Sequence, residues 1–492
     1  MSATHYLAVD LGAESGRVML GTLDDGRVAL EEIHRFPNRT LTVGKHLHWD
    51  LDHLQTAIFL GVEKAAARGL PIAGISTDSW GVDYVLLDAK GAAISNPYCY
   101  RNPWTHDATA RLFKKLPFAD IYQETGIQFM TINTIYHLEA QQHEDPVVLS
   151  SADHFLNIAD YFNAQLSGVE AAEQSLASTT QVYNPRTQAW SEKIVSALGF
   201  KRSLLPRTVP SGTVLGPITG EFAKHPALAR TKIIATCSHD TGAAVAAVPA
   251  SGDNWCYLSS GTWSLLGAEL PGPVISDAAR ADGFTNEVGL GGTIRFLKNI
   301  AGLWVLQECR RAWEAAGQSY TYEELTSLAV ENGPANAHIS LNDARFLSPG
   351  DMPGKIAAFC RETAQTAPAT TGQFVRTILE SLALTYAETL RQLEELVGRK
   401  FEKLHIVGGG SRSNLLNQLA ADATQLTVVT GPVEATAIGN ILIQALALGH
   451  LESAGHLRRI VEKSFPTQIF FPGEGFPGSV RARFQKLSIQ KS

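Results

Sequence analysis

A hairpin at the start of the chain constrains the fold more than any other feature. Residues 7–10 and 18–23 are apolar runs with the length and composition of strands, and Gly12 and Gly16 lie in the segment between them. Glycine adopts a positive φ at little steric cost, so this segment is predicted to form a tight turn. A third strand is predicted at residues 28–36. The chain therefore begins with a hairpin and a further strand.

A helix and two more strands follow in the predicted first lobe. Apolar residues recur every three or four positions over about residues 52–68, which is the spacing of one helix face. Residues 72–77 and 82–87 return to strand composition. The predicted order is three strands, a helix and then strand again.

The same order of elements starts again near the middle of the chain. Residues 255–258 and 263–266 have strand composition on either side of a small-residue turn at 259–262. Two short strands and an apolar helix are then predicted within 284–297 and 301–316. Few residues are identical between the two copies, so the repeat is one of pattern. It predicts an α/β chain with two lobes.

The boundary between the two predicted domains lies near residue 248. Residues 206–220 are rich in proline and glycine, which is typical of irregular chain, and residues 233–248 have the pattern of a strand that leads into a helix. We therefore divide the chain into domains 1–248 and 249–492.

Charge and composition exclude one class of partner. The chain has 492 residues, of which 45% are hydrophobic, so it can bury two cores. Only 18% are charged, the formal net charge is -7, and no long run of lysine or arginine is present. A nucleic-acid-binding protein needs a basic surface, so nucleic acid is not expected as a partner. The composition leaves the oligomeric state open.

Cysteine spacing and hydropathy indicate the compartment. The five cysteines are scattered and form no CxxC pair, which argues against a disulfide framework or a zinc site and favours a reducing cytoplasm. The N-terminal sequence MSATHYLAVD lacks a basic segment followed by an apolar core, and the most apolar later stretch, 437–448, is interrupted by Asn440 and Gln444. No membrane segment is expected, and we predict a cytoplasmic protein.

The opening turn is a candidate phosphate site. No lysine follows Gly16 and no helix follows the turn, so neither the P-loop nor the dinucleotide fingerprint applies. A hairpin turn with two glycines can still direct successive backbone N–H groups toward an anion. Asp10, at the end of the preceding strand, is a candidate ligand for Mg²⁺, because hard cations prefer carboxylate oxygen. The alternative is an ordinary β-turn capped by Asp10.

Two further small-residue segments are candidate nucleotide contacts. The turn SSGT, which ends at Thr262, repeats the first turn, and two such turns that face each other would hold an oligophosphate from both sides. Gly408–Gly410 lie between a predicted strand and a helix whose cap is Ser411 or Ser413. Backbone without Cβ lets a base or ribose approach closely, and a helix N-terminus favours negative charge. The alternative is a tight strand-to-helix connection.

Asp240 is the candidate catalytic carboxylate. In the stretch ATCSHDTGAAV it falls between a predicted strand and a helix of small residues, beside His239 and Thr241. An ordinary helix cap explains this position, but the same carboxylate can also accept the proton of a substrate hydroxyl that attacks a phosphoryl group.

Sugar contacts are expected from the stretches STDSWGVDY and FLKNIAGLW. Trp80 and Trp304 are candidates to pack on the apolar face of a sugar, although aromatic residues more often pack in the core. Gly81, Asp83 and Asn299 are candidates to approach or hydrogen-bond the sugar hydroxyls.

Together these motifs resemble the FGGY family of carbohydrate kinases. The similar stretches occur in the same order over nearly the whole chain: VDLGAESGRVML, TDSWGVDYVLLD, DIYQETGIQF, SHDTGAAV, YLSSGTWSLLG, LKNIAGLWVLQ, CRETAQ and LHIVGGG. The resemblance implies an α/β fold of two ribonuclease-H-like, actin-like ATPase lobes that flank a cleft for ATP and sugar. It agrees with the repeated hairpin pattern.

The resemblance also implies a role for individual residues. Asp240 matches the catalytic base of the family and Asp10 its Mg²⁺-associated aspartate. The matching nucleotide contacts are Ala13, Glu14, Ser15, Gly16, Arg17, Thr262, Gln307 and Gly409. The matching sugar contacts are Gly81, His239, Thr241 and Asn299. Glu14 stands where relatives carry a small hydroxyl residue, so we expect its carboxylate to point away from phosphate.

The implied reaction is ATP-dependent phosphorylation of a ketose, with L-rhamnulose phosphorylated at O1 as the first expectation. ATP and Mg²⁺ are the implied cofactors. The alternatives are a kinase for another ketose or polyol such as fuculose, xylulose or glycerol, an actin-like ATP switch without a small-molecule acceptor, and a catalytically inactive sugar-binding relative.

Overall fold

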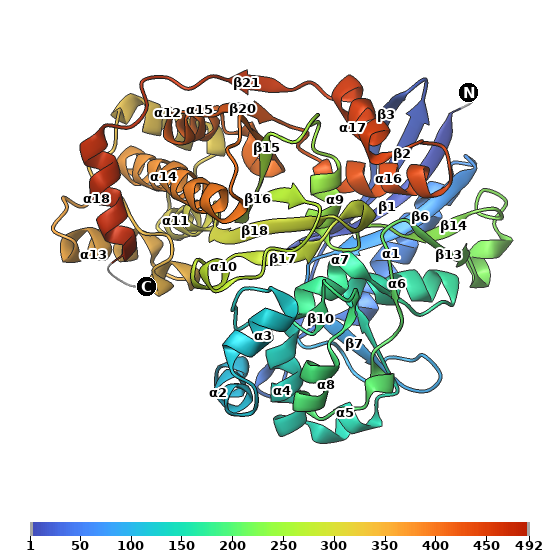
Figure 1. Ribbon diagram of the computed structural model, residues 1–492. Helices are drawn as coiled ribbons and strands as arrows, with labels where there is room; N and C mark the ends of the chain where they lie inside the picture. Colours follow the sequence, from blue (N-terminus) through green and yellow to red (C-terminus); the bar gives the residue numbers. More distant parts are fainter. Residues whose placement is uncertain (1–2, 490–492) are drawn as a thin grey trace. The chain divides into compact units, whose positions relative to one another are not determined.

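The computed structural model describes residues 3–489 as two compact α/β units that are not contiguous in sequence (Figure 1). The first unit takes the chain up to Ser251 and adds Glu269–Phe296 and Ala435–Phe465. The second takes Gly252–Ala268, Leu297–Glu434 and the chain from Pro466 onward. No helix within residues 3–489 is long and apolar enough to cross a membrane.

A six-stranded sheet forms the centre of the first unit. Its order is β13 (Thr213–Pro217), β14 (Lys232–Ala235), β6 (Ile72–Ser79), β1 (Thr4–Leu11), β2 (Ser15–Asp24) and β3 (Arg27–Pro37). The predicted hairpin and third strand are confirmed, since β1, β2 and β3 are antiparallel neighbours. β6 joins β1 in parallel. The predicted strand at 72–77 is therefore also confirmed.

The expectation that the glycines of the opening turn adopt a positive φ was wrong. Neither Gly12 nor Gly16 adopts a positive φ. Instead, a Cβ on Gly16 would lie 2.3 Å from the ring of Phe36 on the neighbouring strand. Position 16 therefore requires glycine for close packing rather than for backbone freedom.

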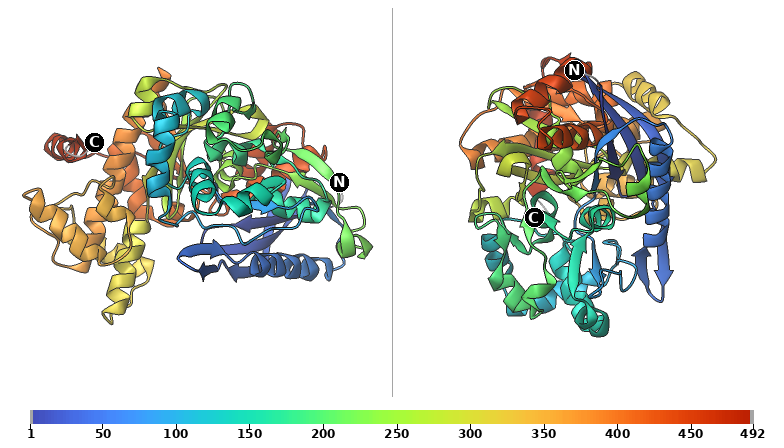
Figure 2. Two further views of the ribbon diagram at one scale, coloured as in Figure 1. Left: turned by 90° about the horizontal axis from the view of Figure 1, so that it is seen from below. Right: turned by 90° about the vertical axis from the view of Figure 1, so that its right-hand side faces the viewer.

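The predicted helix at 52–68 is confirmed as α1 (Leu51–Ala66), which lies along β2 and β3 (Figure 2). Its apolar face contributes Leu54, Ile58 and Val62 to the core of the sheet. The Asp50 side chain caps the helix by accepting a hydrogen bond from the backbone N–H of His53 at 3.0 Å.

The predicted order of three strands and then a helix was incomplete. A second hairpin, β4 (Thr40–Val43) with β5 (His46–Trp49), precedes α1. The side chains of β4 are exposed, so this strand lacks the apolar alternation that identifies a half-buried strand. The predicted strand at 82–87 is shorter, β7 (Tyr84–Leu87), because Val82 has a φ of 73°.

The first unit also contains many shorter elements. Up to residue 251 they are α2 (Thr105–Lys115), α3 (Phe118–Thr125), α4 (Thr134–Glu144), α5 (Pro146–Ser151), β8 (His154–Asn157), α6 (Ile158–Ser167), β9 (Ala172–Glu173), α7 (Gln174–Ala177), η1 (Ser178–Thr180), β10 (Tyr183–Asn184), β11 (Ala189–Trp190), α8 (Glu192–Leu198), η2 (Arg202–Leu204), β12 (Thr208–Val209), η3 (Gly220–Lys224) and α9 (Asp240–Ala246). The later segments add α10 (Asp277–Ala281), β17 (Thr285–Val288), η4 (Leu290–Gly292), α16 (Ala435–Ala447) and α17 (Ala454–Ser464).

Helix α16 joins the first unit although it comes from the far end of the sequence. It packs on β1, β6 and α9, and Figure 1 shows it in orange beside the blue strands. Gln444 donates to the carbonyl of Leu7 at 2.9 Å, and Asn440 donates to Asp78 at 2.6 Å. The two polar residues that interrupt this apolar helix therefore bond to the first sheet.

The second unit repeats the strand arrangement of the first. Its neighbours run in the order β16 (Trp263–Leu270), β15 (Trp255–Ser260), β19 (Lys403–Val407), β20 (Thr427–Thr430) and β21 (Gln468–Phe470). β15 and β16 form an antiparallel hairpin, and β19 and β20 follow in parallel, as β1, β2, β6 and β14 do. The predicted repeat of pattern is therefore confirmed at the level of topology.

The other elements that lie mainly in the second unit are β18 (Ile294–Ala301), α11 (Trp304–Ala315), α12 (Tyr322–Asn332), η5 (Ala344–Leu347), α13 (Met352–Glu362), α14 (Thr371–Val397), η6 (Gly409–Arg412), α15 (Asn414–Thr424) and α18 (Gly478–Ile489). Apolar residues on one stripe of residues 374–397 also predict a long helix, which is confirmed as α14. Ser413, one of the two expected caps, caps α15 by accepting a hydrogen bond from the backbone N–H of Leu416 at 3.4 Å.

Candidate active site

Asn38 holds the loop between β1 and β2. Its backbone N–H donates to the carbonyl of Glu14 at 3.0 Å, and its side-chain amide donates to the carbonyl of Gly12. Because a trans peptide places its N–H opposite its carbonyl, the N–H group of Ala13 points away from Asn38. The Glu14 side chain is exposed, and Ser15 is half-buried. The loop therefore presents backbone N–H on the side that Asn38 leaves open.

Asp10 lies at the base of this loop in an ion pair. Its Oδ2 is 2.5 Å from Nη2 of Arg17, the residue opposite it on β2. Asp78 of β6 is the register partner of Asp10 on the other side and is fully buried. Asp78 was not among the residues predicted from the sequence. It is the last residue but one of β6, which pairs in parallel with β1.

Two carboxylates lie side by side in the core, and the pKa of one of them is shifted. Burial raises the pKa of Asp78 well above its usual value, and the negative charges of Asp10 and Asp240 raise it further. Oδ2 of Asp78 accepts from Asn440, whereas Oδ1 has no hydrogen-bond partner within residues 3–489. The region between these carboxylates therefore carries excess negative charge.

The three carboxylates fit a hard cation, although they do not form a complete metal cage. Carboxylate oxygens are the ligands that Mg²⁺ prefers, and the unpartnered Oδ1 of Asp78 is an available acceptor. Among the described residues, no group of three ligating side chains surrounds a single metal position. Mg²⁺ commonly keeps several waters and uses one or two carboxylates together with substrate phosphates, which agrees with this arrangement.

Asp240 lies at the first turn of α9, which follows β14 after a short connection. Its carboxylate accepts from the backbone N–H of Thr241 at 2.5 Å and from the Thr241 hydroxyl at 3.1 Å, and the side chain is 31% exposed. The residue in the N-cap position is His239, whose Nε2 lies 3.4 Å from Asp240 Oδ1. Asp240 is thus an accessible carboxylate in a fixed orientation.

A buried glutamate fixes the backbone that carries these residues. Glu173 Oε2 accepts from the backbone N–H of Ser238 and of Ser175, both at 3.0 Å. The Ser175 hydroxyl in turn accepts from the backbone N–H of His239 at 3.1 Å. The carbonyl of Ser238 accepts from the N–H of Ser79 at the end of β6. Sequence analysis missed Glu173, because only the fold brings it to this segment.

The segment after β6 contains the expected Gly81 in a constrained turn. A Cβ at Gly81 would lie 3.0 Å from the hydroxyl oxygen of Thr179. The next residue, Val82, has a left-handed φ, which is unusual for a β-branched side chain and is typical of functional sites. Thr134 donates to the Val82 carbonyl at 2.6 Å and fixes this conformation.

Two residues of the same segment are not available to a sugar. Trp80 is 6% exposed and packs against Trp49, with ring centroids 4.5 Å apart, so the expectation of core packing is confirmed. Asp83 is also buried, and its Oδ2 accepts from the indole N–H groups of both tryptophans at 2.6 and 2.8 Å. The hypothesis that Asp83 bonds sugar hydroxyls was wrong, because its carboxylate holds the two indoles in place.

The nucleotide residues expected in the second unit cluster around the turn of its hairpin. The carbonyl of Thr262 accepts from the backbone N–H of Trp304 at the start of α11 at 3.1 Å. Gln307 lies one turn further along α11. Its Oε1 and the indole Nε1 of Trp304 are buried atoms with no hydrogen-bond partner among the described residues. Such unpartnered polar atoms beside a small-residue turn fit a polar ligand.

The three consecutive glycines have three different environments. Gly408 has a φ of 84°, and a Cβ on Gly410 would lie 2.0 Å from the Ser260 hydroxyl. Gly409 is exposed, and a Cβ there would meet nothing within 4 Å. The structure therefore requires the first and third glycines for packing, and only the middle one faces open space. Asn299 is a half-buried residue of β18, also in the second unit.

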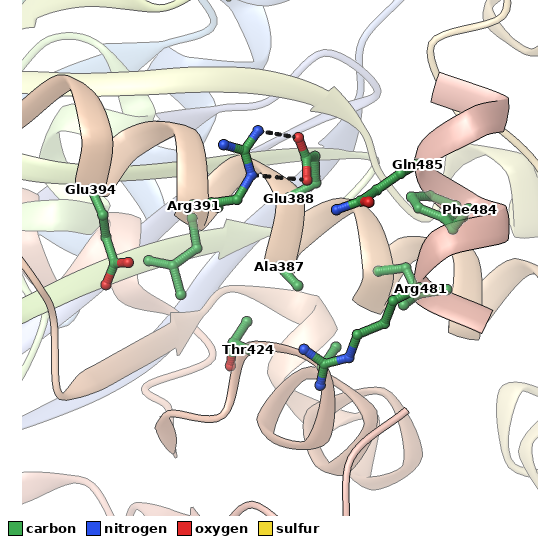
Figure 3. A pocket seen from close by; sticks show the side chains of 11 residues that line it. Ala387, Glu388, Arg391, Glu394, Thr424, Arg481, Phe484 and Gln485 are labelled. Carbon is green, nitrogen blue, oxygen red and sulfur yellow. Dashed lines mark hydrogen bonds and ion pairs between the residues drawn. The ribbon is translucent and has the colours of Figure 1, made fainter. Parts of the chain in front are cut away.

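The structure places the predicted residues in two groups. Asp10, the loop 13–17, Gly81 and the segment 239–241 belong to the first unit, and Thr262, Asn299, Gln307 and Gly409 to the second. A pocket of about 230 Å³ in the second unit, between α14, α15 and α18, contains none of them (Figure 3). Its arginine Arg391 is paired with Glu388 at 2.6 Å.

Comparison with family models covers most of the chain. The model described as "FGGY family of carbohydrate kinases, N-terminal domain" matches residues 5–247. The C-terminal domain of the same family matches residues 256–448.

Similar curated proteins extend over nearly the full length. A rhamnulokinase of Bacteroides thetaiotaomicron is 42% identical over 95% of this chain and 96% of its own. Rhamnulokinases of Lactiplantibacillus plantarum and Bacillus subtilis are each 39% identical over 99% of both chains.

Solved structures of other kinases have the same fold. A gluconate kinase from Lactobacillus acidophilus superimposes with a TM-score of 0.80 at 19% identity, over 99% of this chain and 96% of that chain. A xylulose kinase from the same organism gives 0.78 at 18% identity with the same coverage. The Plasmodium falciparum glycerol kinase with ADP gives 0.79 at 14% identity over 98% of this chain and 96% of that chain.

Proposed function

Since the chain belongs to the FGGY family of carbohydrate kinases, we propose that it transfers the γ-phosphoryl group of ATP to O1 of L-rhamnulose, giving L-rhamnulose 1-phosphate and ADP. The observation that carries the choice of sugar is the set of rhamnulokinases that are about 40% identical over nearly the whole chain. The solved kinases for other sugars are below 20% identity and support the fold alone.

Asp240 is the proposed catalytic base. Its carboxylate is accessible, and its orientation is fixed by two hydrogen bonds from Thr241. A base in that position takes the proton from the attacking hydroxyl of the ketose, a contribution of about 10²- to 10⁴-fold to the rate. Phosphoryl transfer otherwise depends on positioning and charge neutralisation, which are the tasks of the surrounding residues.

The other residues predicted from the sequence are assigned to phosphate, nucleotide and sugar binding. Backbone N–H groups of the loop from Ala13 to Arg17 bind phosphate oxygens, and the exposed Glu14 side chain takes no part. Thr262, Gln307 and Gly409 contact the nucleotide, as the unpartnered amide oxygen of Gln307 and the open face of Gly409 support. The proposed sugar contacts are Gly81, His239, Thr241 and Asn299.

Mg²⁺ is the proposed metal, with Asp10 as its protein contact and the nucleotide phosphates as its other ligands. When bound, the metal neutralises charge on the transferred phosphoryl group. Asp10 holds its carboxylate at the base of the phosphate loop, and Arg17 neutralises it when no metal is bound. Asp10 and Arg17 therefore orient the phosphate groups of the nucleotide, although they do not surround the metal on all sides.

We assign residues 1–248 to sugar binding and the first phosphate loop, and residues 249–492 to the second phosphate loop and the nucleotide. The proposed partners are the ketose and ATP alone. A cytoplasmic location is supported by the five cysteines, all buried as free thiols.

The test is ADP release with Mg-ATP over a panel of L-rhamnulose, L-fuculose, D-xylulose, L-ribulose and glycerol. Asp240→Asn should lose at least about 10²-fold in kcat while still binding ATP. Asp107→Asn is the matched control, because Asp107 also lies in the first turn of a helix but in none of the proposed roles, and it should keep full activity.

Each outcome of the panel has a definite meaning. Preference for L-rhamnulose supports the proposal. Selective turnover of another panel member keeps the kinase and replaces the substrate. ADP release that no sugar stimulates contradicts the proposal and favours an actin-like ATP switch.

A further inference from the structure

Arg295 is a fully buried arginine beside the segment that carries Asp240. It lies in the part of β18 that belongs to the first unit and has 0% exposure. A buried guanidinium is costly unless its charge is paired. Its Nη1 forms an ion pair with Glu287 Oε2 at 2.9 Å, and its Nε and Nη2 donate to the carbonyl of Val288 at 3.3 and 3.2 Å. Its remaining contact is His239.

We infer that Glu287 and Arg295 are positioning residues that fix the ring of His239, with its Nε2–H directed at Asp240 and the bound sugar. The inference rests on the proposed function, since His239 is a sugar contact only by that proposal. Neither Glu287 nor Arg295 was among the residues predicted from the sequence.

The direction of one hydrogen bond decides the tautomer of His239. Arg295 Nη2 lies 3.1 Å from His239 Nδ1. A guanidinium can only donate, so Nδ1 must accept, and the ring proton resides on Nε2. That nitrogen is 3.4 Å from Asp240 Oδ1. The imidazole therefore offers a donor at the position where the proposed base and the sugar hydroxyl meet.

Glu287 supplies the charge that keeps Arg295 in place. Its Oε2 also lies 3.2 Å from His239 Nδ1, but this oxygen forms no hydrogen bond within residues 3–489, so Nδ1 can accept from Arg295. Burial would raise the pKa of Glu287, but the positive charge of Arg295 opposes this shift, and the pKa is lowered overall. An ionised carboxylate is the species that can hold a guanidinium.

The backbone of this segment does not depend on Arg295. The N–H of His239 donates to Ser175, and Ser238 bonds to Glu173 and Ser79. Loss of the guanidinium should therefore free the imidazole ring while the chain around Asp240 stays in place. In a variant without the guanidinium, a change in sugar binding can therefore be distinguished from a change in folding.

A second buried trio of the same residue types serves as the matched control. Glu380 of α14 is 2.6 Å from Arg376 Nε and 3.1 Å from His338 Nε2. It lies in the second unit and contains no proposed site residue. Arg376→Gln should change the melting temperature without changing the KM for either substrate.

The experiment combines kinetics with a tautomer measurement. Arg295→Gln and Glu287→Gln should each raise the KM for the ketose at least tenfold and leave the KM for ATP within twofold. In a His239→Ala background, Arg295→Gln should add less than twofold, because the ring it positions is gone. Arg295→Lys should restore only part of the loss, because lysine lacks the fork of donors.

Nitrogen NMR of the wild-type protein labelled with ¹⁵N-histidine reads the tautomer directly. The His239 resonance, assigned by its absence in His239→Ala, should show a proton on Nε2 and none on Nδ1. A proton on Nδ1, or kinetic effects of Arg295→Gln that are equal with and without His239, would overturn the inference. The NMR result holds whichever sugar is turned over, so failure of the proposed substrate is distinguishable from failure of this inference.

Discussion

Asp10 and Asp78 are register partners on the parallel strands β1 and β6, and both carboxylates are buried. Arg17 pairs with Asp10, whereas the one side-chain donor to Asp78 among residues 3–489 is the neutral amide of Asn440. The two carboxylates therefore have different tasks. Asp10 carries a charge at the proposed phosphate loop, and Asp78 lies behind it in the core.

Replacing Asp10 and Asp78 one at a time should affect catalysis and metal binding differently. Asp10→Asn is expected to lower kcat at least about 100-fold, the scale of losing one electrostatic contact in a transition state. Asp78→Asn should weaken metal affinity by about 10-fold, as a residue behind a metal ligand does. Initial rates against Mg²⁺ concentration, and Mn²⁺ binding followed by electron paramagnetic resonance, measure both effects. Equal effects of the two variants would contradict this division.

Gly16→Ala should destabilise the first unit by about 1–3 kcal/mol, because the new methyl group would overlap the Phe36 ring. The free energy of unfolding in urea measures the cost. Phe36→Leu, which is destabilising by itself, should reduce the additional cost of Gly16→Ala when the two are combined. If the two costs simply add, the close contact is not the reason for the glycine.

Gly409→Ala and Gly410→Ala form a matched pair of single-methyl changes. A methyl at 409 meets open space, so stability should stay within about 0.5 kcal/mol of the wild type while the KM for ATP rises. A methyl at 410 would overlap Ser260 and should cost about 1–3 kcal/mol. Urea unfolding and ATP kinetics distinguish them. An unchanged ATP KM in Gly409→Ala would remove Gly409 from the nucleotide contacts.

Asp83 should make the stability of the protein depend on pH. Burial raises its pKa to about 7, although the indole donors of Trp49 and Trp80 oppose the shift. In the unfolded chain the pKa is about 3.9, so between about pH 4 and pH 7 the folded state binds more protons. Stability from this group is complete at low pH and is lost as pH rises through 7, by at most about 1.4 kcal/mol per pH unit.

Asp83→Asn keeps an oxygen acceptor for the indoles and removes the titration. The melting temperature of the variant, relative to that of the wild type, should therefore increase from pH 5 to about pH 7 and then level off. A difference that stays constant over this range would show that Asp83 does not titrate there.

The local elements were predictable because their signals are local. Apolar runs identified the strands β1, β2, β6, β15 and β16, and helical spacing identified α1 and α14. The strand β4 was missed because its side chains are exposed, and β7 was predicted too long because nothing in the sequence indicates the left-handed φ of Val82. The role of Asp83 was misjudged because its partner Trp49 is 34 residues away.

By itself the sequence determined two repeated hairpin units, the position of Asp240 between a strand and a helix, and the resemblance that points to a sugar kinase. Only the tertiary structure decided that α16 packs against β1 and that Asn440 bonds to Asp78, 362 residues earlier in the chain. It alone brought Glu287 and Arg295 to His239. The physical reason is that hydrogen bonds and ion pairs depend on distance in space, whereas patterns in a sequence report only neighbours along one strand or one helix.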